Sequence, residues 1–383
     1  MYIQRDLEKP LLVLAKQYPV LTITGPRQSG KTTLCRKIFK KKLYISLEDP
    51  NNRDFAEKDP KTFLAQDKNG MIIDEIQRAP ELMSYIQTIV DNKPQKGYYI
   101  LTGSQQFELM AKLTQSLAGR TAIIKLLPFS YSEIYKKKYP DLEDVLYKGF
   151  YPKIFSERLD PTKELSFYIN TYIERDVRLL TNVKDLKTFE TFIKICAGRT
   201  GQVLNYANIS NEVGVDIKTV KKWLSILEAS FIIRIIPPYY KNMNKRLVKS
   251  PKLYFIDTGL VCYLLGIKKP AQLTGHPLLG SIFETYVYGE LFKNFYNKVE
   301  NDNLYFYRDH RGNEVDVIFD KATSIEQLEI KLSKTVTSAM FNGLCFLKDK
   351  DNYTVDRSLL VYGGNRSFKR NDIDIISWRN ISI

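Results

Sequence analysis

The stretch that most constrains this chain is VLTITGPRQSGKTT, residues 20–33. Its first residues are apolar and β-branched, which is typical of a buried strand, and the residues from Gly30 onward suit the first turn of a helix. Gly25, Gly30, Lys31 and Thr32 have the spacing G-x-x-x-x-G-K-[ST]. In such a turn, backbone N–H groups and a helix N-terminus surround phosphates, and the lysine reaches the outer phosphate oxygens. The pattern therefore predicts a bound nucleoside triphosphate.

The residues of this loop are the predicted contacts of the triphosphate. The hydroxyl of Thr32 would complete a magnesium site, because Mg²⁺ prefers near-octahedral oxygen ligands. The predicted cofactors are therefore a nucleoside triphosphate and Mg²⁺. The predicted contact residues are Gly25, Pro26, Arg27, Gln28, Ser29, Gly30, Lys31, Thr32 and Thr33.

A second apolar strand ends in two acidic residues. GMIIDEIQ, residues 70–77, contains Asp74 and Glu75 directly after its apolar run, which is the Walker B pattern. One carboxylate of such a pair holds Mg²⁺, usually through water, and the next can polarise the attacking water. We assign Asp74 to the metal ion and Glu75 to water activation.

Two further polar residues near strands are candidates for the same site. Ser104 ends the apolar run YYILTGSQQ and could sense the γ-phosphate by hydrogen bonding, or could only cap the helix predicted for residues 105–118. Arg120 lies just before a fourth apolar strand. It could neutralise charge on the transferring phosphoryl group, in cis or across a subunit interface, or could form a salt bridge at the rim of the sheet.

The overall charge narrows the choice of partners. The formal net charge is +15, which favours polyanionic partners, either nucleic acid or an anionic membrane surface.

No stretch approaches the ~18 apolar residues of a membrane-spanning helix, and the N-terminus does not resemble a signal peptide. The four cysteines lie far apart without a C-x-x-C pair, which fits a reducing compartment. We therefore expect a cytoplasmic protein that does not contact a membrane.

Six motifs occur along the chain in this order: GPRQSGKTT, IIDEIQRAPEL, ILTGSQQF, SLAGR, LPFSYSE and TYIERDV. Together they resemble the prokaryotic AAA-type ATPases that carry a C-terminal domain of unknown function, and the resemblance extends over nearly the whole chain. It implies an α/β fold with a P-loop parallel sheet, then a winged helix, then a nuclease-like module. It also implies ATP as the nucleotide. GFYPK, residues 149–153, departs slightly from the Gly-Gly-Tyr/Phe-Pro usual in that family.

The middle of the chain changes character after a helical stretch. Residues 200–260 contain a helix, a turn at Gly214 and a second helix that Asp216 is expected to cap. A basic connection follows, with Lys241, Lys245, Arg246, Lys249 and Lys252 and no acidic residue. A helix-turn-helix followed by a basic hairpin predicts a winged helix, which could place one helix in the DNA major groove and the wing on phosphates. It could equally serve only for packing or assembly.

The last third brings acidic residues and a lysine onto neighbouring predicted strands. A hairpin over residues 304–320 carries Asp316, and the next strand carries Glu329 and Lys331. Because side chains alternate along a strand, Glu329 and Lys331 share a face beside Asp316, and Glu314 points to that face as a candidate helper. The order of elements resembles the PD-(D/E)xK nuclease core, and that resemblance implies Glu284 as a further metal ligand.

In such a site two carboxylates could hold Mg²⁺ against a scissile phosphate, while the lysine orients or deprotonates water. The alternative is a buried ion cluster in a fold that no longer cleaves. The chain is therefore interpreted as a P-loop ATPase domain (1–130), a helical lid (131–199), a winged helix (200–262) and a PD-(D/E)xK-like domain (263–383). The predicted activity is ATP hydrolysis coupled to DNA, with Mg²⁺-dependent cleavage as a further candidate and a homo-oligomer left open. The rival interpretation is a slow nucleotide switch whose last domain recognises or assembles but does not cut.

Overall fold

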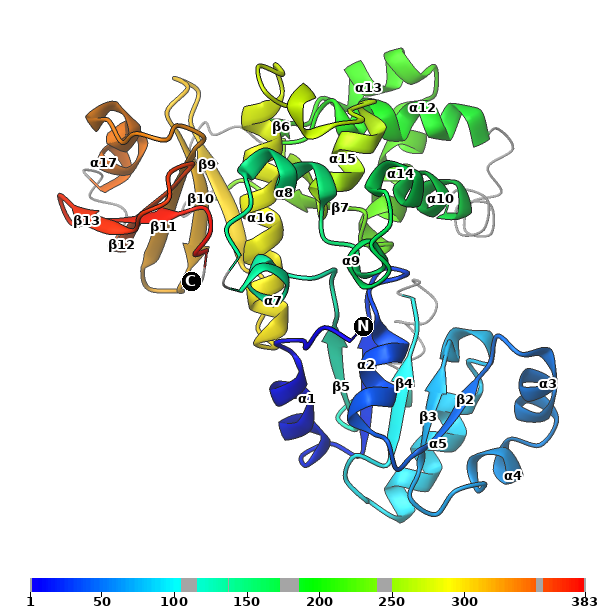
Figure 1. Cartoon of the computed structure of the whole chain (residues 1–383). Helices are drawn as coiled ribbons and strands as arrows, with labels where there is room; N and C mark the ends of the chain where they lie inside the picture. Colours follow the sequence, from blue (N-terminus) through cyan, green and yellow to red (C-terminus); the bar gives the residue numbers. More distant parts are fainter. Residues whose placement is uncertain are drawn as a thin grey trace. The chain divides into compact units, whose positions relative to one another are not determined.

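The structure is a computed structural model, and it describes residues 2–104, 116–136, 138–172, 186–239, 250–348 and 354–381. The chain forms two compact units (Figure 1). Unit 1 consists of Met1–Phe129 with the short pieces Ala229–Phe231 and Phe295–Asn301. Unit 2 consists of Ser130–Glu228, Ile232–Asn294 and Asp302–Ile383. Each unit is described by itself below.

Unit 1 is built on a five-stranded parallel sheet with the strand order β2-β3-β4-β1-β5. Its strands are β1 (Val20–Thr24), β2 (Leu43–Ser46), β3 (Met71–Asp74), β4 (Tyr99–Thr102) and β5 (Thr121–Lys125). Its helices are α1 (Glu8–Ala15), α2 (Lys31–Ile38), α3 (Pro50–Lys58), α4 (Pro60–Leu64), the 3-10 turn η1 (Ile76–Arg78) and α5 (Leu82–Asn92). The predicted α/β fold with a parallel sheet is confirmed.

Helices cover both faces of this sheet. Every residue of β1 is buried, as its apolar and β-branched sequence requires. One apolar cluster joins the sheet to α1 and α2, through Leu11 and Leu34 among others. A second cluster joins the opposite face to α3, α4 and α5, through Phe63 and Ile86 among others. The carboxyl ends of the parallel strands therefore share one edge between two helical layers, where α/β proteins place their ligand sites.

Unit 2 begins with short helices. They are α7 (Tyr131–Tyr135), α8 (Leu142–Lys148), α9 (Pro152–Ser156), α10 (Pro161–Tyr172) and α12 (Leu186–Ala197). The GFYPK stretch lies between α8 and α9, and its glycine has a structural reason. A Cβ on Gly149 would lie 2.2 Å from Oδ1 of the buried Asp257, whose Oδ2 accepts a hydrogen bond from the N–H of Phe150 at 2.7 Å. Arg175 and Asp176 of the TYIERDV motif lie outside the described residues.

A helix-turn-helix with a small sheet follows. Its elements are β6 (Gln202–Val203), α13 (Tyr206–Val213), α14 (Ile217–Ala229), β7 (Ile233–Ile236) and β8 (Lys252–Phe255), and the antiparallel sheet has the order β6-β8-β7. Asp216 caps α14 as predicted, because its Oδ1 accepts a hydrogen bond from the N–H of Thr219 at 2.9 Å. Trp223 of α14 packs edge-on against Phe189 and Phe192 of α12. Of the predicted basic connection over residues 241–252, residues 241–249 lie outside the described residues.

The rest of unit 2 is organised around a six-stranded sheet and one long helix, α16 (Leu279–Asn297). The sheet order is β13-β14-β12-β11-β10-β9, antiparallel from β9 to β11 and parallel from β11 to β14. The strands are β9 (Leu304–Arg308), β10 (Glu314–Asp320), β11 (Ile325–Lys331), β12 (Val355–Tyr362), β13 (Phe368–Arg370) and β14 (Ile373–Ser377). The other elements are α15 (Thr258–Leu264), η3 (Pro270–Gln272), η4 (Ser338–Phe341) and α17 (Asn342–Lys348). The predicted hairpin and third strand are confirmed.

Two further findings concern the apolar character of the helices and the state of the cysteines. In the part of the chain that the structure describes, no helix combines the length and the apolar character needed to cross a membrane. All four cysteines carry free thiols, and three of them are buried.

Candidate functional site

The glycine turn after β1 has the backbone shape that the sequence predicts. Gly25 has φ +146°, and a Cβ at this position would lie 2.1 Å from the carbonyl oxygen of Leu126. Gly30 has φ 91° in the left-handed region and directly precedes α2. Both positions therefore need glycine, the first for close backbone approach and the second for its dihedral angle. The turn delivers the first residue of α2, Lys31, to the mouth of the loop.

Lys31 is buried and bound to the loop itself. Its Nζ donates to the carbonyl oxygens of Gly25 at 3.0 Å and Pro26 at 2.7 Å. Burial lowers the pKa of Lys31 to about 8, although the carboxylates of Glu75 and Asp74 act in the opposite direction. This ammonium is shielded from water and contacts two neutral carbonyl groups. A charged phosphate oxygen would therefore stabilise it strongly.

The rest of the loop also suits a phosphate. Ser29 is fully buried, and its Oγ has no hydrogen-bond partner among the residues that the structure describes. Its carbonyl oxygen accepts a hydrogen bond at 2.9 Å from Nη1 of Arg5, a buried residue ahead of α1. Gln28 has φ 59° and is exposed, Arg27 is half-buried and Thr33 is exposed. The sequence reasoning did not find Arg5, because nothing near it in the chain indicates a contact with the loop.

Asp74 is the last residue of β3, and its carboxylate accepts hydrogen bonds from three hydroxyl groups. Its Oδ2 accepts hydrogen bonds from Thr32 Oγ1 at 2.9 Å and from the Tyr44 hydroxyl at 2.8 Å. Its Oδ1 accepts a hydrogen bond from Thr102. Burial, together with the hydrogen bond to Asp74, raises the pKa of Tyr44. The predicted metal pair Thr32 and Asp74 therefore lies together at the carboxyl edge of the sheet.

Glu75 follows in an unusual backbone conformation, with φ 57° and ψ 47°. Its carboxylate accepts a hydrogen bond from Nε2 of Gln77, which also donates to Ser104 Oγ at 3.1 Å. Ser104 is thus linked to the candidate catalytic carboxylate. Of the helix predicted for residues 105–118, residues 105–115 lie outside the described part. Gln77 was not among the predicted site residues, although it lies two positions after Glu75. Within the described part of the chain, the buried Oε1 of Gln77 has no hydrogen-bond partner.

Arg120 does not belong to this site within one chain, so the predicted cis role is wrong. It precedes β5, whose first residue pairs with Val20 at the start of β1, and so lies at the amino edge of the parallel sheet. Its guanidinium makes a two-pronged ion pair with Asp91 at the end of α5, with Nε to Oδ1 at 2.5 Å and Nη2 to Oδ2 at 2.8 Å. The salt bridge at the sheet rim is the observed role. A role across a subunit interface stays a prediction.

The residues of unit 1 fit a magnesium–triphosphate group. The buried ammonium, the unpartnered Ser29 hydroxyl and the start of α2 are donors for phosphate oxygens, and Thr32 with Asp74 supplies oxygen ligands for Mg²⁺. When bound, the metal ion would neutralise charge on the β- and γ-phosphates. Glu75 would hold and polarise a water beside them.

In unit 2, Asp316 of β10 and Glu329 and Lys331 of β11 come together as predicted. Lys331 Nζ lies 2.7 Å from Glu329 Oε1 and 3.5 Å from Asp316 Oδ2. Asp316 Oδ2 accepts the N–H of Ile330 at 2.8 Å, and Glu329 Oε2 accepts the N–H of Asp316 at 3.3 Å. Burial raises the pKa of Glu329 to about 8, and the charge of Asp316 adds to this effect.

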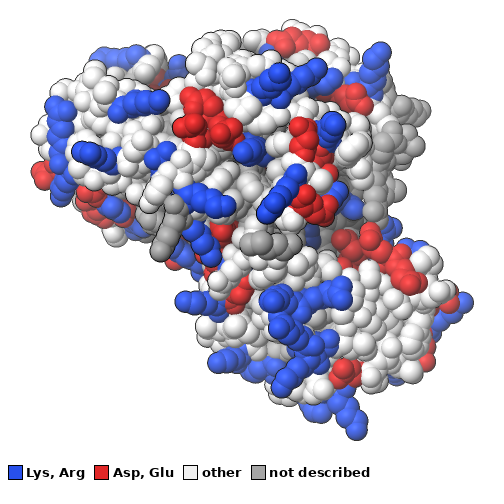
Figure 2. Space-filling model, in the orientation of Figure 1, with Lys and Arg blue, Asp and Glu red and all other residues white. Residues whose placement is uncertain are grey.

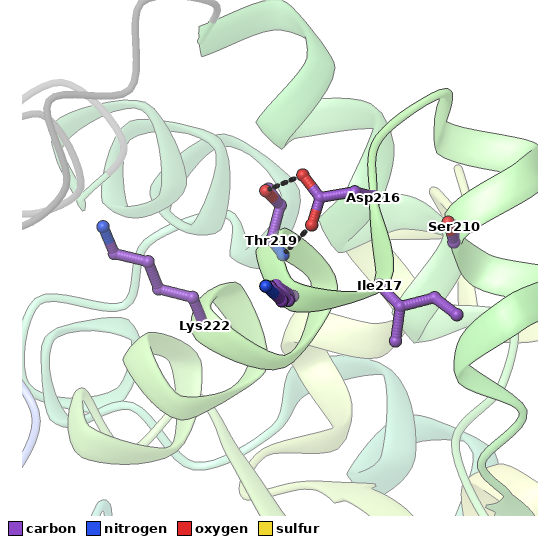
Figure 3. Close-up of a pocket in the computed structure, with 6 residues that line it drawn as sticks. Ser210, Asp216, Ile217, Thr219 and Lys222 are labelled. Atoms are coloured by element: carbon purple, nitrogen blue, oxygen red, sulfur yellow. Dashed lines mark hydrogen bonds between the residues drawn. The ribbon is translucent and has the colours of Figure 1, made fainter.

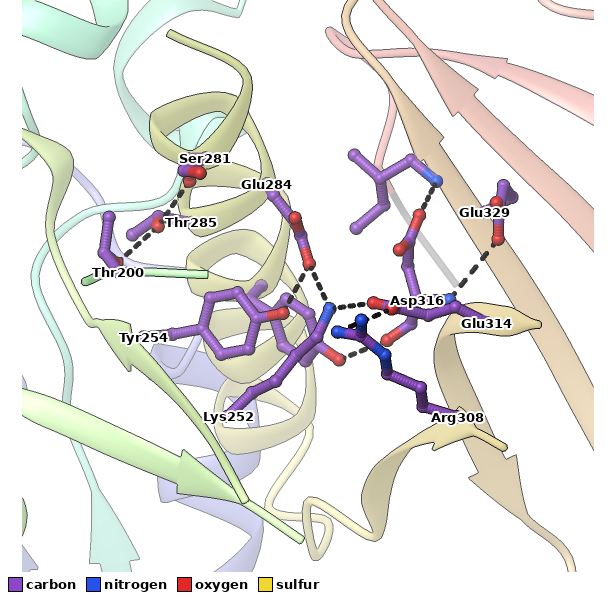
Figure 4. A network of polar contacts seen from close by, with 12 residues as sticks. Thr200, Lys252, Tyr254, Ser281, Glu284, Thr285, Arg308, Glu314, Asp316 and Glu329 are labelled. Atoms are coloured by element: carbon purple, nitrogen blue, oxygen red, sulfur yellow. Dashed lines mark hydrogen bonds and ion pairs between the residues drawn. The ribbon is translucent and has the colours of Figure 1, made fainter. Parts of the chain in front are cut away.

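Glu284 of α16 faces a different cation, Lys252 (Figure 4). The Lys252 Nζ lies 3.0 Å from Glu284 Oε1 and 2.6 Å from Glu314 Oε1. Glu284 also accepts a hydrogen bond from the Tyr254 hydroxyl. Lys252 was predicted as part of the basic phosphate-facing connection, and that prediction is wrong because its side chain is only 3 % exposed. Alternation along β8 sends Lys252 and Tyr254 to the same face, toward the carboxylates.

The carboxylates of unit 2 are of the right type for a divalent cation, but they are not arranged as ligands. Over the described ranges, no group of three or more His, Cys, Asp or Glu residues is placed to hold a metal ion. The oxygens that would bind one are engaged by ammonium groups and backbone N–H groups instead. The predicted metal role of Glu284, Asp316 and Glu329 therefore does not fit this arrangement.

A third candidate surface is the outward face of α14. Lys218, Lys221 and Lys222 are exposed, as predicted, while the apolar stripe of α14 is buried. An open hollow of about 760 Å³ lies beside the turn into α14, lined by Ser210, Asp216, Ile217, Lys218, Thr219 and Lys222 (Figure 3). Figure 2 shows Lys and Arg side chains in several groups, with Asp and Glu between them. On the face drawn, positive charge is therefore not gathered on a single element.

Comparison with known proteins adds a domain description to each part. Residues 17–135 match an AAA domain, residues 139–271 match a domain of unknown function (DUF8612), and residues 279–381 match a domain of unknown function (DUF4143). An uncharacterised protein of Mycobacterium tuberculosis is 28% identical over 374 residues, which cover 96% of this chain and 82% of the relative. An uncharacterised protein of Haemophilus influenzae is 26% identical over 391 residues, covering 93% of this chain and 91% of the relative.

Solved structures are similar only at low scores. A Walker-type ATPase of Pyrococcus abyssi has a TM-score of 0.42 and 14% identity, covering 69% of this chain and 96% of that one. RuvB of Thermotoga maritima has a TM-score of 0.32 and 17% identity, covering 61% of this chain and 89% of that one. Such scores add nothing to what the sheet order and the loop geometry show. The geometry of unit 1 and the match of residues 17–135 to an AAA domain together support an AAA-type P-loop ATPase.

Proposed function

We propose that this protein hydrolyses ATP with Mg²⁺ and couples the nucleotide cycle to engagement of DNA. The observation that carries the ATPase part is the convergence of Lys31, the Thr32–Asp74 pair and Glu75 at the carboxyl edge of one parallel sheet. Groups that can bind phosphate, hold the metal ion and activate water thereby lie at the same edge of the sheet. A cytoplasmic location, supported by the free thiols, and assembly of several copies with Arg120 acting across an interface belong to the same proposal.

The DNA part rests on the exposed lysines of α14 and on the order of elements around them. The succession α12, β6, α13, α14, β7 and β8 supports a winged helix, a fold in which the second helix of the helix-turn-helix can face DNA. Three exposed lysines on one helix would contact phosphates and give binding that depends strongly on salt. The net charge of +15 supports the same partner class.

Replacing Lys218 and Lys222 together by glutamate is expected to abolish stimulation of ATP turnover by DNA while leaving basal turnover unchanged. The reason is that reversed charges on α14 repel the phosphate backbone without touching unit 1. Phosphate release with and without DNA measures the effect. The matched control is the same double change at Lys163 and Lys194, two exposed lysines on α10 and α12. If turnover ignores DNA in the parent protein, the slow switch is the better interpretation.

A second candidate activity is DNA cleavage by a PD-(D/E)xK-like site, because Asp316, Glu329 and Lys331 meet on adjacent strands. Since the carboxylate oxygens are engaged by ammonium and N–H groups, a divalent cation would have to displace these contacts, and any cleavage should be slow. We expect slow nicking of supercoiled plasmid at high Mn²⁺ concentration that Asp316→Asn removes. Asp320→Asn, the same change at the half-buried last residue of β10, is the control and should nick like the parent. Plasmid that stays intact at high protein concentration would instead identify the last domain as a non-cleaving recognition or assembly module.

A further inference from the structure

The carboxylate cluster of unit 2 is neutralised by the protein's own cations. It contains Glu284, Glu314, Asp316 and Glu329, and the positive groups that touch these carboxylates are Lys252, Lys331 and Arg308. Lys331 is expected from the strand pattern, because it lies two residues after Glu329 on β11. Lys252 is not, because it comes from β8 of the three-stranded sheet, more than thirty residues before Glu284.

Lys252 is buried at this position and does not lie on the surface of the protein. Its side chain is 3 % exposed, and its Nζ bridges Glu284 of the long helix and Glu314 of the large sheet. The same Nζ lies 5.4 Å from the centre of the Phe306 ring. Burial alone would lower the pKa of Lys252, but the charges of Glu284, Asp316 and Glu314 together raise it above its usual value. The ammonium therefore stays charged inside the unit.

Aromatic side chains fix the partner carboxylate. The Tyr254 hydroxyl donates to the same Oε1 of Glu284 that Lys252 contacts. The Tyr254 ring stacks on Tyr288, with ring centres 3.9 Å apart, and the Tyr288 hydroxyl donates to the backbone oxygen of Asp316 at 2.5 Å. Glu284 Oε1 thus accepts from two donors, the Lys252 ammonium and the Tyr254 hydroxyl (Figure 4).

We propose that Lys252 is the internal counter-ion of this cluster and occupies the place between Glu284 and Glu314 that a divalent cation would need. The ammonium must move away before a metal ion can bind between these two carboxylates, because it fills the space at contact distance from both of them and repels a second cation. The wild-type protein should therefore bind divalent cations weakly at this cluster. This inference rests on the carboxylate cluster of the second candidate activity but not on cleavage itself.

The test is Mn²⁺ binding to the full chain, with ATP absent, measured by titration calorimetry and by the Mn²⁺-dependent shift of the unfolding temperature. Lys252→Met should bind Mn²⁺ at the cluster more tightly than wild type by roughly tenfold or more, a change typical of residues that surround a metal site. The unfolding temperature of this variant should be lower than that of wild type without Mn²⁺ and should rise more when Mn²⁺ is added. Adding Glu284→Gln to Lys252→Met should remove the gain.

Lys293→Met is the matched control. Lys293 is also a buried lysine paired with a glutamate, with its Nζ 2.8 Å from Oε1 of Glu290 on the same helix α16. Its loss should lower stability without any gain in Mn²⁺ affinity. If Lys252→Met does not fold, Lys252→Gln, which keeps a hydrogen-bond donor for Glu284, provides the same comparison. Equal Mn²⁺ affinity in wild type and the Lys252 variant, or a gain that survives Glu284→Gln, would overturn the inference. Plasmid nicking is read separately, so absence of cleavage leaves this result intact.

Discussion

Glu75→Gln is expected to lower kcat for ATP hydrolysis by about a hundredfold or more while leaving the affinity for Mg²⁺-ATP nearly unchanged. A positioned general base contributes roughly 10²–10⁴-fold to a rate, and the amide cannot take a proton from water. The nucleotide contacts should survive, because Lys31, Ser29 and the Thr32–Asp74 pair do not depend on this charge for their positions. The near-identical shape of glutamine also keeps the left-handed backbone at this position.

Phosphate release under saturating ATP gives kcat, and calorimetric titration with Mg²⁺-ATP gives the affinity. Glu57→Gln, the same change on the exposed side of α3, is the control and should leave both values unchanged. A variant that hydrolyses ATP at the parent rate would remove Glu75 from the catalytic role. Gln77 and Ser104, which are linked to its carboxylate, would then be the next residues to test for a role in hydrolysis.

Lys31→Ala is expected to weaken Mg²⁺-ATP binding by roughly a hundredfold. Hydrogen bonds to charged groups contribute about 1.5–3 kcal/mol each, and each 1.4 kcal/mol corresponds to tenfold in affinity. In the free protein the ammonium is buried and bound only to two loop carbonyls, so its best partner is the incoming phosphate. Calorimetry measures the loss, and Lys37→Ala, an exposed lysine of the same helix, is the control. Unchanged ATP affinity in Lys31→Ala would contradict the assignment of the loop.

The same lysine gives the binding a defined pH dependence. Its pKa in the free protein is about 8, lowered by burial, and the phosphates bind the protonated form. Affinity should therefore be level below pH 8 and fall by up to about tenfold per pH unit above it. Lys31→Arg should bind without this fall, since a guanidinium stays protonated over the whole range.

The sequence was informative wherever chemistry and backbone shape are both encoded locally. The loop from Gly25 to Thr32 predicts its own strand, turn and helix, because only glycine tolerates the two special positions. The hairpin and the alternation of Glu329 and Lys331 predicted which side chains meet, because a strand has a period of two. The N-cap at Asp216 was predictable for the same local reason.

What the sequence could not supply were contacts between distant segments. Arg5 reaches the loop carbonyl of Ser29 across 24 residues, and Tyr44 reaches Asp74 across 30. For Arg120 the sequence left a role at the phosphates and a salt bridge at the rim of the sheet both open, and the structure shows the salt bridge, to Asp91. The parallel order puts the start of β5 at the edge far from the loop. Lys252 was grouped with basic neighbours, whereas the strand pattern of KLYF turns it inward.

The bridge made by Lys252 also affects how the chain can be divided. The region matched as one domain, residues 279–381, contains all four carboxylates, but the ammonium that bridges Glu284 and Glu314 lies outside it. A fragment cut at that boundary would lose the ammonium that bridges Glu284 and Glu314, while Arg308 would stay beside Glu314, and it would also lose the Tyr254 hydroxyl. The excised piece would then have to take up protons, ions or water to remain folded. The charge balance of the carboxylate cluster in the isolated fragment would therefore differ from that of the same residues in the intact protein.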